Sequence, residues 1–465
     1  MKLVGLRFTS GHAVWVAVLA PLAIMWARET RYWWAGPAVV AVAVVVATVT
    51  IRGRRLTGWL ATAWRWLWRR RKPLEIPSEP VVGATVRPGD HLAVRWEGGA
   101  LVTVIELVPR PFTPTVIVDG HAHTDDVVDT RLVERLLSVN CPDLEADIIS
   151  AGYRVATTAN ADLVSHYREM IGSDPAPAHR RTWIILRAKP HRAGKSAQRR
   201  DRDVAGLASY LVASATRVAD QLASNGVDAR CERSFDDFDR ATHVSFRKER
   251  WSRIEGNNTF TAAYAAPGGP DVWWSASADH TITRMRIVPG MPPRSTVLLT
   301  TPTKAKRPSG FSRIAGDQRF ALHGQTLIPD RHWQVPIGSA GVLLGETASK
   351  YPVYVPFDDI DVSVSLGDAQ AFLQFTLRAV AAGGIVTLTP HFRELAELIG
   401  VGTGLEAKVA WTNVTTYFSH RAGTDHVKLR RDVIGTPRHR RLPIRAISPP
   451  WESRYHQALP DQGRS

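Results

Sequence analysis

The sequence predicts a two-helix transmembrane hairpin at the N-terminus, followed by a cytoplasmic α/β (α+β) region with two subdomains. Two observations predict the hairpin: two apolar runs lie back to back, and most of the formal net charge of +16 lies in the first 72 residues. Beyond residue 80, short apolar strand patterns alternate with amphipathic helix patterns, which predicts the layered region. A chain of 465 residues with 44% apolar residues is long enough to bury cores of this kind.

The predicted hairpin occupies residues 1–52. Residues 8–27 (FTSGHAVWVAVLAPLAIMWA) and 32–51 (YWWAGPAVVAVAVVVATVTI) contain no Asp, Glu, Lys or Arg. Each run is about long enough to cross a ~30 Å hydrocarbon core as a helix. Buried helices of a soluble core are the alternative, but such cores seldom need two runs of this kind in succession. A cleavable signal peptide would need a small-residue cleavage region, which is missing from this sequence.

Basic residues predict the orientation of the hairpin. The first 72 residues carry twelve Lys and Arg against one acid, Glu29, so they hold +11 and leave +5 for the other 393 residues. Two of the twelve lie in the turn between the spans, and eight lie in residues 52–72. Because basic residues accumulate on the cytoplasmic side, we expect a multi-pass protein of the cell (inner) membrane with two spans and both termini in the cytoplasm.

Residues 53–72 predict a basic amphipathic helix on the membrane surface. Apolar side chains, Trp59 and Trp64 among them, recur at three- and four-residue spacing, with arginines opposite. Such a helix is typical of contact with anionic phospholipid, where each basic residue contributes about 1 kcal/mol. A protein groove is the alternative, and the +5 over the rest of the chain disfavours nucleic acid. With the aromatic rings that flank the turn, the predicted membrane-contact residues are Trp26, Trp33, Trp34, Arg54, Trp59, Trp64, Arg65, Arg69, Arg70 and Arg71.

The first predicted subdomain covers residues 80–300 and follows a proline-spaced linker. Short apolar runs predict its strands, and 3.6-residue periodicity predicts its helices. Strands are expected at residues 100–108, 115–120, 144–150 and 182–188, with further strand patterns at 242–251, 280–288 and 295–301. Helices are expected at residues 129–138, 161–172 and 196–226.

A basic, proline-bearing stretch at residues 301–310 (TPTKAKRPSG) lacks apolar periodicity and predicts the next boundary. The second predicted subdomain, residues 311–448, contains the strand patterns GVLLGET, YPVYVPF, IDVSVSL and IVTLT and the helix patterns DAQAFLQFTLRAVAAGG and HFRELAELIG. Residues 449–465 are polar and are predicted to form a flexible tail.

The sequence DGHAHTDD, residues 119–126, contains side chains of the types that bind metals. His121 and His123 on a strand would point to one face, and Asp125 and Asp126 follow closely. A metal site needs further ligands from elsewhere, however, and no matching His/Asp cluster stands out. A polar loop after a strand explains the motif equally well, so no metal-binding residue is predicted.

FDDFD (235–239) and FDDID (357–361) each contain Asp-x-Asp, which in sugar-nucleotide transferases helps to hold a metal bound to diphosphate. A helix cap is the alternative, because carboxylates accept the free amides at a helix start. The corresponding functional alternative is a membrane-attached glycosyltransferase-like enzyme at the inner leaflet, with Asp359 and Asp361 as its best residues. The pattern is weak, and no catalytic residue is predicted.

Three further features predict no chemistry. Gly338, Gly341 and Gly345 match neither a P-loop nor a dinucleotide-binding motif, so turns are expected there and no cofactor. The basic runs at residues 196–202 and 436–445 are expected to be solvated, with docking onto an acidic partner as the alternative. The two cysteines match no zinc or redox spacing and are expected to be buried thiols in a reducing compartment.

Several strings along the chain resemble one known family. These are LRFTSGHA, ETRYWWAG, VVATVT, EPVVGATVRPGDH, LVPRPFTPTVIVDG, NCPDLEADIISAGYRV, YAAPGGPDVWWSA, ADHTITR and VIGTPRHR. They look like the E component, EccE, of the mycobacterial type VII secretion system, and most like that of the first ESX paralogue. The resemblance covers essentially the whole chain.

The resemblance implies a plasma-membrane subunit with two transmembrane helices and a cytoplasmic domain. It implies a place at the periphery of a large complex with the B, C and D components, of which C is the ATPase motor. Family members have a cytoplasmic fold with some likeness to sugar transferases, but no transfer activity is associated with them. The family has no motif of catalytic residues to carry over, so a non-catalytic subunit is expected.

Overall fold

The structure, a computed structural model, divides into two compact units. One comprises Met1–Glu75, Lys248–Trp251 and Ala315–Asp317, and the other comprises Ile76–Arg247, Ser252–Ile314 and Gln318–Ser465. The residues that the structure describes are 4–6, 25, 34, 38, 41, 49–51, 54–69, 80–85, 91–157, 159–198, 203–304, 306–357, 362–366, 369–411, 415–419, 427–429, 433–435 and 442–459.

The first unit contains a small antiparallel sheet and a helix. Its elements are β1 (Val4–Leu6), β2 (Val49–Ile51), β3 (Arg54–Arg55), α3 (Leu56–Arg69) and β13 (Lys248–Arg250). Strand β1 pairs with β2, so the two ends of the predicted hairpin lie side by side. The second predicted span was expected to reach Ile51 as a helix, but its last three residues form β2.

The described residues do not test the predicted spans themselves. Apart from a few single residues and β2, residues 8–27 and 32–51 lie outside the described part of the chain. Among the residues that are described, no helix has the length and apolar character needed to cross a membrane.

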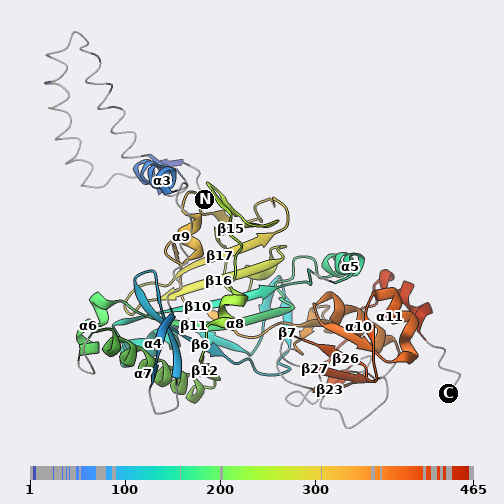
Figure 1. Cartoon of the computed structure of the whole chain (residues 1–465). Helices are drawn as coiled ribbons and strands as arrows, with labels where there is room; N and C mark the ends of the chain where they lie inside the picture. Colours follow the sequence, from blue (N-terminus) through green and yellow to red (C-terminus); the bar gives the residue numbers. More distant parts are fainter. Residues whose placement is uncertain are drawn as a thin grey trace. The chain divides into compact units, whose positions relative to one another are not determined.

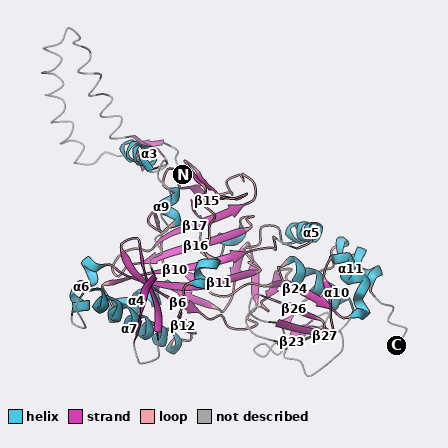
Figure 2. Cartoon of the chain, viewed as in Figure 1, coloured by secondary structure: helices cyan, strands magenta, loops and turns pink. Residues whose placement is uncertain are grey.

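A large antiparallel sheet forms the centre of the second unit (Figures 1 and 2). Its strands follow the order β14-β15-β17-β16-β10-β11-β6-β5-β4, and all these neighbours are antiparallel. They span Pro80–Thr85 (β4), His91–Glu97 (β5), Ala100–Leu107 (β6), Leu144–Tyr153 (β10), His179–Ala188 (β11), Arg253–Glu255 (β14), Phe260–Ala265 (β15), His280–Ile287 (β16) and Arg294–Thr301 (β17). Three short strands, β12 (Ala229–Cys231), β18 (Ser312–Arg313) and β19 (Ile328–Pro329), pair with β6, β15 and β17.

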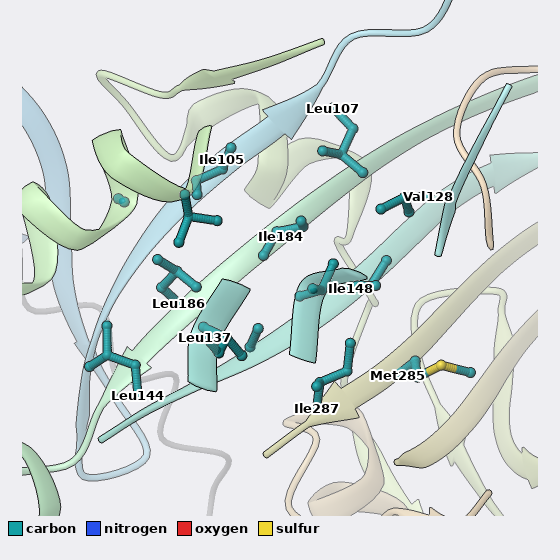
Figure 3. Packing of buried hydrophobic residues seen from close by; sticks show 14 of the residues in the cluster. Ile105, Leu107, Val128, Leu137, Leu144, Ile148, Ile184, Leu186, Met285 and Ile287 are labelled. Atoms are coloured by element: carbon teal, nitrogen blue, oxygen red, sulfur yellow. The ribbon is translucent and has the colours of Figure 1, made fainter. Parts of the chain in front are cut away.

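One face of this sheet is covered by helices and is apolar. The helices are α4 (Thr130–Asn140), α6 (Pro190–Gln198) and α7 (Asp203–Ser224). In β10, Leu144, Ala146 and Ile148 face these helices, because alternate residues of a strand point to the same side. Figure 3 shows Ile148 and Leu137 in this cluster of fully buried side chains.

The opposite face combines an apolar centre with buried charges. The helices α8 (Asp236–Ala241) and α9 (Gln318–Leu322) contribute to its cluster, in which the Trp183 and Phe238 rings meet edge to face at 5.6 Å. Towards one end lies Asp147, which is fully buried and accepts hydrogen bonds from Arg187 Nε at 2.8 Å and Arg286 Nε at 2.6 Å. Burial alone would raise the pKa of Asp147, but the two guanidinium groups bring it well below its usual range.

Most of the remaining elements of the second unit surround a third core, built largely from the C-terminal part of the chain. Residues 127–129, 334–336 and 273–275 instead contribute Val128, Val335, Trp273 and Trp274 to the apolar cluster under α4, α6 and α7. Strands β7 (Thr115–Val118), β8 (His121–His123), β21 (Val342–Glu346) and β22 (Pro352–Val355) form one sheet, and β9 (Val127–Asp129) pairs with β20 (Gln334–Pro336). A further sheet contains β23 (Val362–Leu366), β24 (Ile385–Leu388), β25 (Gly402–Thr403), β26 (Lys408–Ala410), β27 (Thr415–Ser419), β28 (Val427–Leu429), β29 (Val433–Gly435) and β30 (Leu442–Pro443). The helical segments are α5 (Ala161–Ile171), α10 (Ala369–Ala381), α11 (Arg393–Ile399) and the 3-10 turns η1 (Trp273–Ser275), η2 (Pro390–Phe392) and η3 (Pro450–Ala458).

The elements agree with the predicted mixed α/β class but differ from the expected bounds at two places in the second unit. The helix pattern at residues 196–226 covers two separate helices, α6 and α7, with residues 199–202 outside the described part. The large sheet continues past the boundary predicted at residues 301–310, because β18 and β19 pair with it. Subdomains at residues 80–300 and 311–448 therefore share strands of one sheet.

The predicted flexible tail, residues 449–465, begins with the 3-10 turn η3. Residues of η3 were expected to be unstructured, but Glu452 is buried and its Oε1 accepts a hydrogen bond from Arg378 Nε at 2.8 Å. Arg378 lies on α10 with a side chain only 1% exposed. A buried arginine needs an anionic partner, and Glu452 supplies it, so this part of the tail is fixed. Residues 460–465 lie outside the described part.

Candidate membrane-contact site

Helix α3 of the first unit has two apolar faces with different surroundings. On one face, Thr62 is fully buried, and the Trp59 and Trp66 rings lie 6.0 Å and 5.6 Å from the Trp251 ring. Gly316, in the left-handed region at φ +78°, donates its amide to the Trp251 carbonyl at 2.6 Å. A Cβ on Gly316 would lie 2.5 Å from Thr62 Cγ2, so only glycine allows this close packing. One face of α3 is therefore occupied by residues from distant parts of the chain.

The other face of α3 carries an exposed apolar stripe. Leu60, Trp64, Leu67 and Trp68 are spaced as neighbours along one side of a helix, and their exposed fractions are 56%, 65%, 44% and 65%. The Trp64 and Trp68 rings lie 5.8 Å apart. We call these four residues the exposed α3 stripe. Contiguous exposed apolar side chains of this size are typical of an interaction surface.

Helical periodicity placed Trp59 and Trp64 on one face of α3, but the two side chains have different surroundings in the structure. Trp59 is half-buried against Trp251, whereas Trp64 is exposed, and Trp68 was missed. The spacing Trp64-x-x-x-Trp68 was the available signal for Trp68, because residues four apart are neighbours on a helix.

The predicted basic residues lie at both ends of the helix and along it. Arg54 is in β3, and Arg69 is the last residue of α3. The exposed Arg65 donates to Thr62 Oγ1 at 3.4 Å. Trp34 is 58% exposed, and the other predicted contact residues, Trp26, Trp33, Arg70 and Arg71, lie outside the described residues.

Two of the three FDDFD carboxylates pair with arginines of the same unit, and the third, that of Asp236, accepts a hydrogen bond from Ser234 Oγ at 2.7 Å. Asp237 pairs with Arg181 at 3.1 Å and with Arg240 at 3.2 Å, and Asp239 pairs with Arg95 at 2.6 Å. The N-cap residue Phe235 makes no side-chain cap hydrogen bond, but Asp236, Asp237 and Asp239 all lie in the first turn of α8, where carboxylates favour the positive end of the helix dipole. The motif has an ion-pairing role here. The aspartates of FDDID lie outside the described residues.

The DGHAHTDD motif borders an open pocket of about 730 Å³. His121 Nδ1 lies 2.6 Å from Asp271 Oδ2, whereas His123 and Asp125 line the pocket. Asp126 is buried and accepts a hydrogen bond from the Gly338 amide at 3.2 Å, and burial raises its pKa. Within the described parts of the chain, no three His, Cys, Asp or Glu side chains are placed to hold a metal ion.

The glycines and cysteines considered in the sequence are closely packed or at least partly buried. Gly341 takes φ +84° just before β21, and a Cβ there would lie 2.2 Å from the carbonyl oxygen of Val355 in β22, so the close approach to this strand requires glycine. Gly345 lies within β21 and not in the expected turn. Cys141 and Cys231 are free thiols, and burial raises the pKa of each to about 12. Parts of both basic runs, residues 199–202 and 436–441, lie outside the described residues.

Comparison with known proteins identifies the family. Residues 176–266 match the family model of the type VII ESX secretion system translocon, EccE. The chain is 66% identical to the ESX-1 secretion system protein EccE1 of Mycobacterium tuberculosis over 456 residues, covering 98% of this chain and 99% of that protein. The chain belongs to the EccE family. It is also 57% identical to EccE1 of Mycolicibacterium smegmatis over 455 residues, with 98% of each chain covered.

The identities place the chain with the ESX-1 members of the EccE family. The ESX-5 secretion system protein EccE5 of Mycobacterium marinum is 26% identical over 359 residues, covering 68% of this chain and 85% of that protein. The predicted resemblance is thus confirmed. EccE is a family of type VII secretion components and not of enzymes, so the chain is a secretion component.

Proposed function

We propose that this EccE protein is a non-catalytic membrane subunit of an ESX secretion complex. Residues 1–52 would contain two transmembrane helices between β1 and β2, with both termini in the cytoplasm, and the second unit would be held at the periphery of the inner-membrane machine. The partners proposed are the B, C and D components. The support for the hairpin is the pair of uncharged 20-residue runs and the concentration of basic residues after them.

We further propose that the exposed α3 stripe rests on anionic phospholipid of the inner leaflet. Helix α3 begins at Leu56, only a few residues after the second apolar run, so it starts close to the bilayer in this topology. Its exposed tryptophans suit the headgroup layer. Arg54, Arg65 and Arg69 to Arg71 would add about 1 kcal/mol each near an anionic surface. Trp59, packed on Trp251, would contribute to lipid contact less than Trp64.

In this arrangement, α3 would make different contacts on its two faces. One face of α3 contacts Trp251 and Gly316 of the first unit, and the opposite face would contact lipid. A groove of another ESX component is the competing occupant of the stripe.

The topology is tested with a reporter at the C-terminus of the full-length chain in cells. The expected result is a protein that sediments with the membrane fraction, resists an alkaline wash and keeps its C-terminus inaccessible from outside. Recovery in the supernatant after ultracentrifugation, or an externally accessible C-terminus, would overturn the proposal.

The lipid contact is tested by attaching a fluorophore at Leu67→Cys in the full-length protein, reconstituted in vesicles with anionic lipid and a lipid-borne quencher. Cys141 and Cys231 should react little at neutral pH, because burial raises their pKa to about 12. The matched control is Leu405→Cys, which is 97% exposed on the second unit. We expect quenching at residue 67 and none at residue 405. Equal quenching at both positions would contradict the proposal.

A further inference from the structure

A small basic pocket lies beside the large sheet of the second unit, at a place that the proposed role in secretion does not use. It has a volume of about 50 Å³. One buried water needs an accessible cavity volume of about 10–15 Å³, so the pocket has room for one small tetrahedral anion. Its lining comes from β14, β15, β17 and β18, from the loop that follows β17, and from Ser277 in the segment before β16.

The lining carries four cations and no acid. The cations are Arg253, Lys304, Lys306 and Arg313. Arg253 is already paired, because its Nη2 lies 2.7 Å from Glu255 Oε1. For the other three, no ion pair occurs among the residues that the structure describes. The pocket therefore keeps an excess of positive charge, which favours an anionic ligand.

Arg313 is the best-positioned of these cations. It pairs with Tyr264 between β18 and β15, and its Nη2 donates to the Tyr264 hydroxyl at 2.9 Å. Tyr264 is itself fixed by Phe311, whose ring meets it edge to face at 5.9 Å. The Nε of Arg313 is buried and has no hydrogen-bond partner in the described structure. A buried donor without a partner is costly, and an anion in the pocket would supply an acceptor.

The two lysines come from the stretch TPTKAKRPSG, which the sequence predicted only as a boundary. Both side chains belong to exposed residues, so they can close over a ligand without a cost in packing. Pro308, which follows them, also lines the pocket and restricts the backbone of the loop. Two exposed lysines and one guanidinium held by Tyr264 resemble the donor sets that bind phosphate, because arginine offers its planar fork and lysine a point charge.

We propose that this pocket binds the phosphoryl group of a small molecule, either free phosphate or a small phosphomonoester. A phosphoryl dianion matches the three cations that lack an ion pair better than a monoanion does, and it offers several acceptor oxygens to Arg313 Nε and the lysines. The volume admits the phosphoryl group, and the rest of an ester would remain outside the pocket.

The test is calorimetric titration of the full-length protein in detergent at constant ionic strength. Inorganic phosphate and glycerol 3-phosphate are the two ligands, and sulfate is the reference anion. A pH of about 7.5 keeps the ester mostly dianionic, since its second pKa is about 6. Saturable binding of one phosphoryl group per chain, tighter than sulfate, is expected. Binding of both ligands supports a phosphoryl site open to esters, and binding of phosphate alone supports a site for the free ion.

Variants then assign the binding to this pocket. Lys304→Gln with Lys306→Gln should weaken phosphate binding by about tenfold or more, because charge-assisted hydrogen bonds are lost. The matched control is Arg307→Gln, an exposed cation of the same run that does not line the pocket, and it should bind as the parent does. Arg313→Lys, which keeps the charge but removes Nε, should also weaken binding. No binding above sulfate, or equal weakening by Arg307→Gln, would overturn the proposal.

Discussion

The two faces of the large sheet are stabilised by different interactions. One face packs Ile148 and Leu186 under α4 and α7 in a cluster of apolar side chains (Figure 3). The other face buries Asp147 among Arg187, Arg284 and Arg286 next to the Trp183 cluster. An apolar contact that is removed costs the transfer free energy and a cavity, whereas a charge that is removed leaves its partners buried without compensation. The charged face should therefore be the less tolerant one.

The charged face is also not fully satisfied. Arg284 is buried, and its Nε and Nη1 have no hydrogen-bond partner among the described residues. Burial lowers the pKa of Arg284 to about 10, although Asp147 raises it. Asp147 thus holds three arginines, of which Arg187 and Arg286 bind it directly. Substitution of Asp147 is therefore the most direct test of the difference between the charged and the apolar face of the sheet.

The largest effect is expected for Asp147→Ala. Removing one partner of a buried ion pair costs about 3–5 kcal/mol, and here three arginines lose their anion. The free energy of unfolding of the full-length protein, from denaturant titration in detergent, measures the cost. The control is Ile148→Val on the opposite face of the same strand, which should cost about 0.5–1.5 kcal/mol. Equal costs for the two variants would remove the difference between the faces.

A cost of about 2–5 kcal/mol is expected for Leu137→Ala on the apolar face. Leu137 is a fully buried residue of α4 and packs in the cluster of Figure 3. Denaturant titration is again the measurement. Unlike that of Asp147→Ala, this cost should not depend on pH, because no ionisable group is lost. A pH-dependent cost would show that the two faces are coupled.

The pH dependence of stability should come from the charged face. Burial raises the pKa of Asp147, but Arg286 and Arg187 bring it below the value of about 3.9 expected for unfolded chains. The ionised carboxylate therefore stabilises the folded state fully above about pH 5, and this contribution is lost as the pH falls. The difference in unfolding free energy between wild type and Asp147→Ala should shrink below about pH 4. A difference that stays constant down to low pH would contradict this.

The smallest effect is expected for Asp237→Asn in FDDFD. Its carboxylate is 39% exposed and pairs with Arg181 and Arg240, and pairs of this kind contribute about 0–1 kcal/mol. A small change in the unfolding free energy and unchanged secretion in cells are expected. Loss of secretion with an intact fold would restore a functional role for this motif.

Local sequence patterns were enough to predict many of the helices and strands and the family. The apolar run of β6, the periodicity of α4 and its Asp129 cap, whose side chain accepts from the Arg131 amide, depend on residues near one another in the chain. The strings that carry the EccE resemblance are likewise local, and the full-length identity to EccE1 agrees with them.

Which side chains of those elements pack together depends on contacts between distant segments of the chain. Helical periodicity placed Trp59 and Trp64 on one broad face, but Trp251, far away in sequence, packs on Trp59, whereas Trp64 is exposed. In the same way, Arg378 fixes Glu452 in a tail that looked unstructured, 74 positions further along the chain. Periodicity fixes the side of an element on which a residue lies, whereas its partner depends on contacts between distant segments, which the local pattern does not contain.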